Sequence, residues 1–221
     1  MDNDKIITAR IEDKLEQCER GSYITATGFL NMHEQSLAMR IMKGRSDVKS
    51  FFYGGYDDAE RRIILFVPDG YADTLEGVLE MISPLSVLHI KVAPGGRKLT
   101  HRDYLGSVLS LGLDRSVIGD ILVNDKGADM IVNSDIVDFL LSEFHSAGHT
   151  NLQITASDIG ELEVPEQRVK AVRDTLSSPR LDNVVSAALH VSRSEAVRAI
   201  KGCIVFVNHE EVTKIDKRVD E

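Results

Sequence analysis

The sequence predicts an α+β protein built from three successive domains, and three observations lead to this prediction. Helical and strand-like patterns alternate from residue 5 to residue 156, which is typical of mixed folds. Two short helical patterns and one apolar run follow near the C-terminus. The 221 residues also exceed the usual size of a single hydrophobic core. We therefore expect domains at residues 1–93, 94–177 and 178–221.

The composition places the chain among ordinary proteins of the cytoplasm. Hydrophobic residues make up 43% and charged residues 28% of the sequence. Cys18 and Cys203 are isolated, which fits a reducing compartment and argues against a disulfide framework or a structural zinc site. The start is acidic and the longest apolar runs are a few residues, so we expect neither secretion nor a membrane span. No cofactor and no metal are expected.

The N-terminal domain opens with a helix and continues in a βαββαβ order. Residues 5–19 carry apolar side chains at helical spacing, and Gly21 ends this run. The elements expected after it are a strand at 23–29, a helix at 32–42, strands at 48–53 and 62–67, a helix at 71–82 and a strand at 87–92. This order is the ferredoxin-like arrangement that RNA-recognition motifs (RRMs) share with many enzymes and regulators. The arrangement alone therefore decides little about function.

The third of these strands lacks the aromatic pair with which an RRM stacks RNA bases. The aromatic side chains lie on the preceding strand and its turn, at Phe51, Phe52, Tyr53 and Tyr56. Aromatic residues in strands are usually buried. We interpret these rings as core and turn packing, with base stacking as the less favoured alternative.

The central α/β domain begins with a basic loop and a helix. Thr100 precedes the helix and Asp103 follows three residues later, which is an acidic variant of the capping box. The cationic side chains around this helix start are Arg97, Lys98, His101 and Arg102. Backbone N–H groups and the helix dipole favour an anion at such a place. The loop is a candidate phosphate-binding site, and a solvated basic loop is the open alternative.

The remainder of the central domain is expected to form a small sheet and one helix. The predicted elements are strands at 118–123 and 128–132 joined by a turn at 124–127, a helix at 133–144 and a strand at 151–156. Residues 158–178 are expected to form a further strand and a connection to the C-terminal domain.

The C-terminal domain begins with two short helices. The first has an apolar stripe made of Leu181, Val184, Val185, Ala188 and Leu189. Ser192 and Glu195 form an S-x-x-E capping box that starts the second helix. On this helix Ala196, Val197, Ala199 and Ile200 share one arc, and Ser194, Arg198 and Lys201 share the opposite arc. The exposed arc is therefore expected to be cationic, and Arg193 is expected to reach outward beside the helix start.

Two short helices with an arginine at the first turn of each, followed by a strand that ends at Asn208, resemble the S4 RNA-binding domain. The matching residues are Arg180, Leu181, Asp182, Ser192, Arg193, Ala196, Ile200, Val205, Val207 and Asn208. In that family the two-helix face and the following loop bind folded RNA, chiefly through its phosphates and shape. The RNA contacts expected here are Arg180, Ser192, Arg193, Arg198, Lys201 and Lys214. Cys203 replaces a glycine of the family pattern, and that pattern continues past Glu221, so an incomplete module is expected.

The body of the chain resembles the bacterial YlmH family. The segments that carry the resemblance are Phe29-Leu30, residues 54–61, residues 97–106 and residues 118–121. The resemblance covers essentially the whole chain and implies an RRM-like domain, a central α/β domain and a C-terminal S4 domain. It also implies binding to large-subunit rRNA in ribosome-associated quality control, with tRNA as a further candidate partner. In that process a stalled 50S subunit retains its peptidyl-tRNA while a tail-elongating factor extends the peptide.

The charge distribution is compatible with a selective RNA contact. The net charge is −9, but residues 178–221 contain seven Lys or Arg and seven Asp or Glu, so the acidic excess lies in the body. A local basic face can bind phosphates while the rest of the molecule repels non-specific RNA.

Catalytic motifs are missing from the sequence, which contains no Walker A loop, no HExxH and no G-x-S-x-G. We therefore predict a non-catalytic RNA-binding protein. Two alternatives stay open at this point: an RNA-modifying enzyme guided by an S4 domain, and a protein-interaction adaptor with a vestigial S4 tail.

Overall fold

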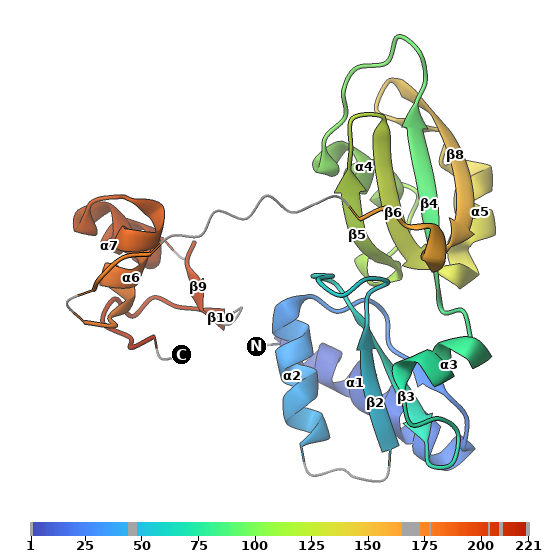
Figure 1. The fold of residues 1–221 in the computed structure, drawn as a ribbon, viewed down its shortest axis with the longest axis horizontal. Coiled ribbons are helices and arrows are strands. Elements are labelled where there is room, and N and C mark those ends of the chain that lie inside the picture. The colour runs from blue at the N-terminus through green and yellow to red at the C-terminus, as the bar shows by residue number, and fades with distance from the viewer. Residues whose placement is uncertain are drawn as a thin grey trace. The chain divides into compact units, whose positions relative to one another are not determined.

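The computed structural model describes residues 2–43, 48–164, 173–176, 178–202, 204–207 and 210–219. The chain divides into two compact units, residues 1–165 and residues 166–221. Helices and strands alternate through the first unit, and the described part of the second contains two helices and a pair of short antiparallel strands (Figure 1). This mixture confirms the α+β class. The three domain ranges expected from the sequence stay a prediction.

The first unit follows the predicted order of elements closely. Its helices are α1 (Asp2–Gly21), α2 (Met32–Met42), α3 (Leu75–Met81), α4 (His101–Leu109) and α5 (Val137–Glu143). Its strands are β1 (Thr25–Ala26), β2 (Val48–Tyr53), β3 (Ile63–Pro68), β4 (Leu85–Val92), β5 (Ile118–Val123), β6 (Gly127–Asn133), β7 (Ser146–Ala147) and β8 (Thr150–Asp158). The main differences are the short β1, a 3₁₀ turn before α5, and the unexpected strand β7.

The first sheet is antiparallel, with strand order β1-β3-β2, and β3 is buried on both faces. Ile64 and Phe66 of β3 pack with apolar side chains of α1 and α2. Ile63, Leu65 and Val67 point to the other face, where they pack with α3. Successive side chains of a strand alternate between faces, so one apolar strand serves two layers of helices.

Strand β4 corrects the βαββαβ expectation. It forms where the sequence predicts the fourth strand, but it lies at the centre of a second antiparallel sheet of order β5-β6-β4-β8-β7 (Figure 1). It pairs with β6 from Leu85 to Lys91 and with β8 from Ser86 to Val92. Two long neighbours satisfy the backbone of β4 on both edges, whereas β1 offers a pairing length of only two residues. Among the described residues, the first sheet therefore has three strands.

Helices α4 and α5 cover one face of the second sheet. The core of this half contains Leu88 and Ile90 of β4, Tyr104 and Val108 of α4, and Leu140 of α5. The strand expected after residue 158 does not form among residues 159–164, where the structure has a 3₁₀ turn at Ile159–Glu161. Residues 165–172 and 177 of that expected connection lie outside the described residues.

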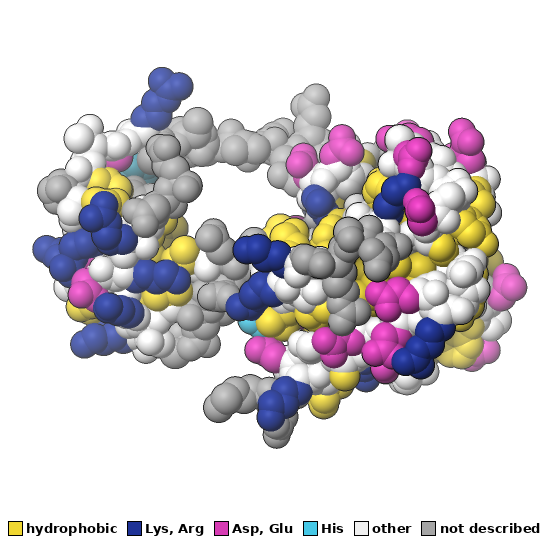
Figure 2. All heavy atoms as spheres, turned by 90° about the horizontal axis from the view of Figure 1, so that it is seen from below, with side chains coloured by type: hydrophobic (Ala, Val, Ile, Leu, Met, Phe, Trp, Pro, Cys, Tyr) yellow, Lys and Arg dark blue, Asp and Glu magenta, His cyan; other side chains and the backbone are white. Residues whose placement is uncertain are grey.

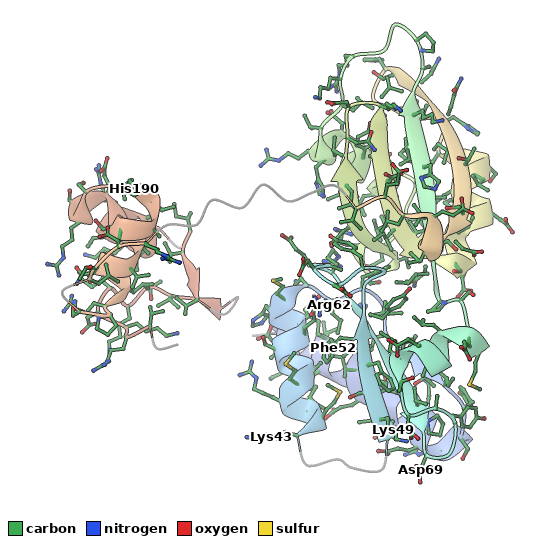
Figure 3. The ribbon with its side chains drawn as sticks, in the orientation of Figure 1. Lys43, Lys49, Phe52, Arg62, Asp69 and His190 are labelled. Atoms are coloured by element: carbon green, nitrogen blue, oxygen red, sulfur yellow. The ribbon has the colours of Figure 1, made fainter. Side chains whose placement is uncertain are left out.

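The aromatic residues of β2 and its turn pack into the core, as predicted. Phe51, Tyr53 and Tyr56 contact the cluster that includes Phe29. Phe52 points to the opposite face of the sheet and packs against the cluster formed with α1 and α2 (Figure 3). The packing interpretation is confirmed for these four rings.

A carboxylate joins the first sheet to the second within the first unit. Asp120 of β5 accepts hydrogen bonds from the Tyr56 hydroxyl (2.9 Å) and from the backbone N–H groups of Glu60 (2.8 Å) and Arg61 (3.1 Å). The Arg61 guanidinium donates to the Ile118 carbonyl oxygen at 3.1 Å. Burial lowers the pKa of Arg61. The loop before β3 is thus bound to β5 by polar contacts as well as by apolar packing.

The second unit contains α6 (Leu181–Leu189), α7 (Arg193–Lys201), and the antiparallel strands β9 (Phe206–Val207) and β10 (Glu210–Glu211). Its buried core consists of Leu181, Val185, Ala196, Ile200 and Val212. The last described residues bind back to the start of α6: Leu181 N–H donates to the Lys217 carbonyl and Val219 N–H donates to the Pro179 carbonyl, both at 2.8 Å. The strand expected at 204–208 covers only β9, and Cys203 and Asn208 lie outside the described residues.

Candidate nucleic-acid interface

Helix α7 begins where the capping box predicts. The Ser192 backbone N–H and hydroxyl both donate to Glu195 Oε2, at 2.9 and 2.6 Å, and the Glu195 N–H donates back to the Ser192 oxygen at 3.3 Å. These bonds lower the pKa of Glu195. Ser192 is exposed and its hydroxyl takes part in the cap, and its expected contact with RNA stays a prediction.

The exposed arc of α7 is cationic, as expected. Ala196 and Ile200 are buried in the core of the second unit, while Ser194, Arg198 and Lys201 are exposed on the other side of the helix. Figure 2 shows Lys and Arg side chains gathered on the visible face of this unit, with few acidic side chains among them. Cations in the last turn of a helix also interact favourably with its dipole.

The buried carboxylate of Asp182 binds Arg180 and Arg193, two of the residues expected to contact RNA. Asp182 of α6 is 1% exposed, and it accepts hydrogen bonds from Arg180 and Arg193. The distances are 3.0 Å (Arg180 Nε to Oδ1), 3.2 Å (Arg180 Nη2 to Oδ2), 2.9 Å (Arg193 Nε to Oδ2) and 2.7 Å (Arg193 Nη2 to Oδ2). The hydrogen bonds from Arg180, followed by those from Arg193, lower the pKa of Asp182 to about 2.

The two arginines remain accessible although Asp182 orients them. The side chain of Arg180 is 37% exposed and that of Arg193 is 61% exposed. Arg193 reaches outward beside the helix start, as the sequence led us to expect, and Asp182 accepts hydrogen bonds from two of its donor atoms. The guanidinium groups are fixed beside the starts of α6 and α7.

Lys214 belongs to the segment that packs on the start of α6. It is exposed, and the carbonyl of its neighbour Ile215 accepts a hydrogen bond from the Asp182 N–H at 3.1 Å. An isolated β-bridge between Arg180 and Arg218 ties the same segment to the N-cap of α6. The fold therefore brings Arg180, Arg193 and Lys214 to one end of the second unit, and Arg198 and Lys201 extend along α7.

In the first unit, the start of α4 is occupied by the protein's own carboxylate. Asp103 accepts from the Thr100 N–H at 2.7 Å, as the capping box predicts, and from Arg97 Nη2 at 2.5 Å. Hydrogen bonds from Arg97, then from Thr100, lower the pKa of Asp103. A phosphate at this helix start would meet that negative charge, so the structure argues against an anion site at the N-terminus of α4 itself.

The other cations of the basic loop are exposed. Lys98 forms a surface ion pair with Asp125 at 3.3 Å, and His101 and Arg102 lie in the first turn of α4 with exposed side chains. Their role in RNA binding stays a prediction.

Sequence reasoning missed four residues that shape these surfaces. Asp182 was placed only in the S4 pattern and Tyr104 within the segment 97–106, and neither was assigned a functional role. Lys91 and Lys126 line a pocket beside the basic loop. An isolated lysine at a strand end gives no periodic signal, so only the register between β4 and β6 reveals that these two lie close together.

No helix in the described part of the chain has the length and apolar character needed to cross a membrane. Across residues 2–219, apart from the gaps given above, no three His, Cys, Asp or Glu side chains are grouped in a way that could hold a metal ion.

Comparisons with known proteins agree with the order of these parts. Three family models match: the YlmH N-terminal domain at residues 3–71, the putative RNA-binding domain in YlmH at residues 84–161, and the S4 domain at residues 179–221. The chain is 31% identical over 186 residues to the Ribosome-associated protein quality control protein P2 of Bacillus subtilis, which covers 84% of this chain and 70% of that protein.

A solved structure supports the fold. The Cell division protein ylmH from Streptococcus pneumoniae superposes with a TM-score of 0.59 at 20% sequence identity, covering 74% of this chain and 95% of that one. The matched domains, the C-terminal S4 unit and the identity to the Bacillus protein lead to one assignment. The chain belongs to the YlmH family.

Proposed function

We propose that this protein is a non-catalytic RNA-binding protein that binds the large ribosomal subunit through its C-terminal S4 domain. Its target is large-subunit rRNA, ribosome-bound peptidyl-tRNA, or both, and its process is ribosome-associated quality control. The name of the Bacillus relative and the matched RNA-binding domains support this proposal. Because its target is the ribosome, we expect it to act in the cytoplasm.

The observation that carries the proposal is the pair of arginines on Asp182. A guanidinium presents several donors in one plane, which matches the oxygens of a phosphate. Side chains that are already fixed lose less conformational entropy when they bind. Arg180 and Arg193 are held by four hydrogen bonds and remain accessible, so they are suited to contact a phosphate backbone of defined shape.

The exposed cations of α7 extend this surface. Arg198 follows Arg193 by five residues and Lys201 by eight, and both lie on the solvent side of the helix. Contacts of this kind act through the release of counterions, so affinity depends strongly on salt. The acidic excess in the rest of the chain opposes binding of unrelated RNA.

The perturbed carboxylates support a non-catalytic role. Groups with strongly shifted pKa values are candidates for catalysis, but they also occur in structural ion pairs. Asp103, Asp182 and Glu195 each have a lowered pKa, and each caps a helix or holds an arginine. These shifts therefore have structural explanations.

The test compares the binding of large subunits by wild type and by Arg198→Ala. Co-sedimentation with purified 50S subunits should show weaker binding by the variant, and the slope of log K against log salt should fall by about 0.9. Lys43→Ala is the matched control because it removes one exposed cation from the end of α2 in the first unit. Equal binding by all three proteins would contradict the S4 proposal.

A second measurement addresses the substrate. Purified 50S subunits that retain peptidyl-tRNA should bind the protein more tightly than vacant subunits if tRNA is part of the target. Incubation of the protein with bulk tRNA and rRNA, followed by mass spectrometry of the nucleosides, tests the alternative of an RNA-modifying enzyme. A specific modified nucleoside would overturn the non-catalytic assignment.

A further inference from the structure

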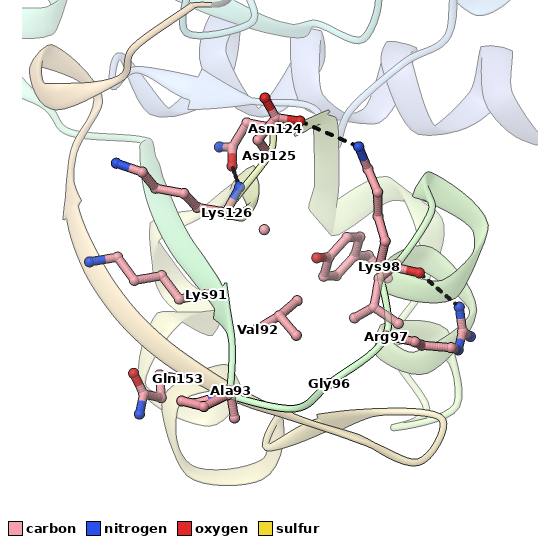
Figure 4. Close-up of a pocket in the computed structure, with 14 residues that line it drawn as sticks. Lys91, Val92, Ala93, Gly96, Arg97, Lys98, Asn124, Asp125, Lys126 and Gln153 are labelled. Atoms are coloured by element: carbon pink, nitrogen blue, oxygen red, sulfur yellow. Dashed lines mark hydrogen bonds and ion pairs between the residues drawn. The ribbon is translucent and has the colours of Figure 1, made fainter.

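A pocket of about 580 Å³ opens beside the basic loop of the first unit. The end of β4, residues 93–99 and the turn between β5 and β6 form its walls (Figure 4). Val92 and Leu99 supply apolar surface, and the exposed Gln153 of β8 lies beside Lys91 on the other face of the sheet. Its size lies in the range of pockets that hold small organic groups.

Tyr104 places an unpartnered hydroxyl in this pocket. The residue is 1% exposed, it lines the pocket, and its hydroxyl makes no hydrogen bond with any described residue. No fully enclosed polar side-chain atom in the described part of the chain lacks a partner, so this oxygen must be open to the solvent of the pocket. Buried tyrosines usually find a partner for the hydroxyl. A bound acceptor would complete this site.

The hydroxyl remains a donor at neutral pH. Burial, and then the charge of Asp103, raises the pKa of Tyr104, so the phenol keeps its proton. Apolar surface with a buried donor of this kind suits a flat heterocycle with a polar edge.

Positive charge flanks the pocket rather than filling it. Figure 4 shows the Lys91 and Lys126 side chains on one side, with both amino groups directed outward. Neither lysine forms an ion pair with a described residue. On the other side Lys98 reaches to Asp125 at 3.3 Å, an exposed pair that contributes little and can open. A phosphate chain that runs along the rim would meet cations while the attached base enters the pocket.

We propose that this pocket binds the base of an unpaired RNA nucleotide, with the Tyr104 hydroxyl on the polar edge of the base and with Lys91 and Lys126 on the flanking phosphates. The inference rests on the proposed function and deepens it, because it gives the first unit its own contact with RNA. Proteins that recognise RNA sequence commonly bind bases that are splayed out of loops or bulges. The cations on the rim favour a nucleotide within a chain over a free nucleotide.

The test uses the full chain and fluorescence anisotropy with labelled RNA hairpins. One set carries a single-nucleotide bulge with each of the four bases in turn, a second carries an abasic residue at the bulge, and a third is fully paired. Wild type should bind the best bulged hairpin about fivefold or more tightly than its abasic counterpart. Thermal unfolding of every variant shows whether the fold is retained.

Two sets of variants separate the hydroxyl from the charges. Tyr104→Phe keeps the buried ring and removes the hydroxyl, so affinity for the bulged RNA should fall roughly two- to tenfold, while affinity for the abasic RNA stays unchanged. The double variant Lys91→Ala with Lys126→Ala should weaken both complexes and lower the salt slope by about 0.7 to 0.9 per lysine. Lys43→Ala, far along the chain from the pocket, should change neither.

Three outcomes would overturn the proposal. If wild type binds the hairpins but base removal and Tyr104→Phe have no effect, the pocket is not a base site, and the proposed function is untouched. If free nucleoside monophosphate displaces the bulged RNA as effectively as unlabelled RNA does, the ligand is a free nucleotide. If wild type binds neither the hairpins nor 50S subunits, the proposed function fails together with the pocket.

Discussion

Arg193 of α7 donates two hydrogen bonds to a single oxygen of Asp182 of α6, at 2.9 Å from Nε and 2.7 Å from Nη2. The bonds join the starts of the two helices, and Arg180 occupies the same carboxylate from the other side. One buried carboxylate therefore fixes two cationic groups that a nucleic acid could contact. We therefore expect the stability of the second unit and its affinity for RNA to be coupled at Asp182.

The substitution Asp182→Asn should weaken the hydrogen bonds that hold Arg180 and Arg193 in place. An amide is close in size to the carboxylate, but it carries no charge and presents N–H groups to guanidinium donors. We expect the free energy of unfolding of the second unit to fall by roughly 1–3 kcal/mol, and affinity for large subunits to fall as well, because the arginines lose their fixed orientation. Chemical denaturation and co-sedimentation measure the two effects.

The control for this variant is Asp216→Asn, which removes an exposed carboxylate from the same unit. It should leave stability nearly unchanged and should not weaken RNA binding. A stable Asp182→Asn protein with the wild-type affinity would contradict the anchoring role.

The same carboxylate predicts a specific pH dependence. In the folded protein the pKa of Asp182 is lowered to about 2, whereas an unfolded aspartate titrates near 3.9. A lowered folded value stabilises the folded state above the unfolded pKa, and this contribution is lost as the pH falls from about 4 to about 2. The difference in unfolding free energy between wild type and Asp182→Asn should therefore shrink over that interval.

Denaturation curves of both proteins at a series of pH values between 2 and 6 provide the measurement. The difference between the two proteins is used because the pKa values of Asp103 and Glu195 are also lowered and affect both proteins alike. A difference that stays constant with pH would rule out Asp182 as the titrating group.

Asp120→Asn should loosen the junction between the two sheets of the first unit. Asp120 accepts from three donors, so an amide would place its N–H₂ group against at least one of them. We expect a loss of roughly 1–3 kcal/mol in unfolding free energy. Tyr56→Phe removes only the hydroxyl donor and should cost less, about 1 kcal/mol. Asp57→Asn in the same loop is exposed and serves as the control.

Local patterns predicted most elements, because helix caps and apolar periodicity depend on neighbouring residues. The capping boxes at Thr100 and Ser192 start α4 and α7 as expected. Leu181 and Val185 of the predicted apolar stripe of α6 are buried, whereas Ala188 and Leu189 at the end of that helix are exposed. The cationic arc of α7 followed from the same periodicity. These features needed no knowledge of distant contacts.

What the sequence did not predict depends on residues far apart in the chain. The sequence pattern of β4 would suit a strand in either sheet. The strand joins the second sheet because β6 and β8 are long enough to pair with it on both edges. The bonds between Asp182 and Arg193 span two helices, and Lys98 meets Asp125 across a turn. Ion pairs of this kind leave no periodic signal, so the sequence overestimated the number of free cations in both basic segments.

The substitution Gly127→Ala should distort the pocket by displacing its backbone, without removing a polar contact. The backbone of Gly127 has φ +158°, and a Cβ atom there would lie 1.8 Å from the Ile90 carbonyl oxygen. Strand β6 would have to move away from β4, which should destabilise the first unit by about 1–3 kcal/mol and weaken binding of the bulged RNA.

Gly106→Ala is the matched control, because Gly106 lies within α4 with nothing within 4 Å of its added methyl group. That variant should stabilise the protein by about 0.5–1 kcal/mol, since alanine favours the helix over glycine, and it should leave RNA affinity unchanged. Thermal unfolding of both variants tests whether Gly127→Ala lowers and Gly106→Ala raises the stability, and fluorescence anisotropy measures their affinities for the bulged RNA. Equal stability of the two variants would mean that the close approach of β4 and β6 at Gly127 does not constrain the pocket.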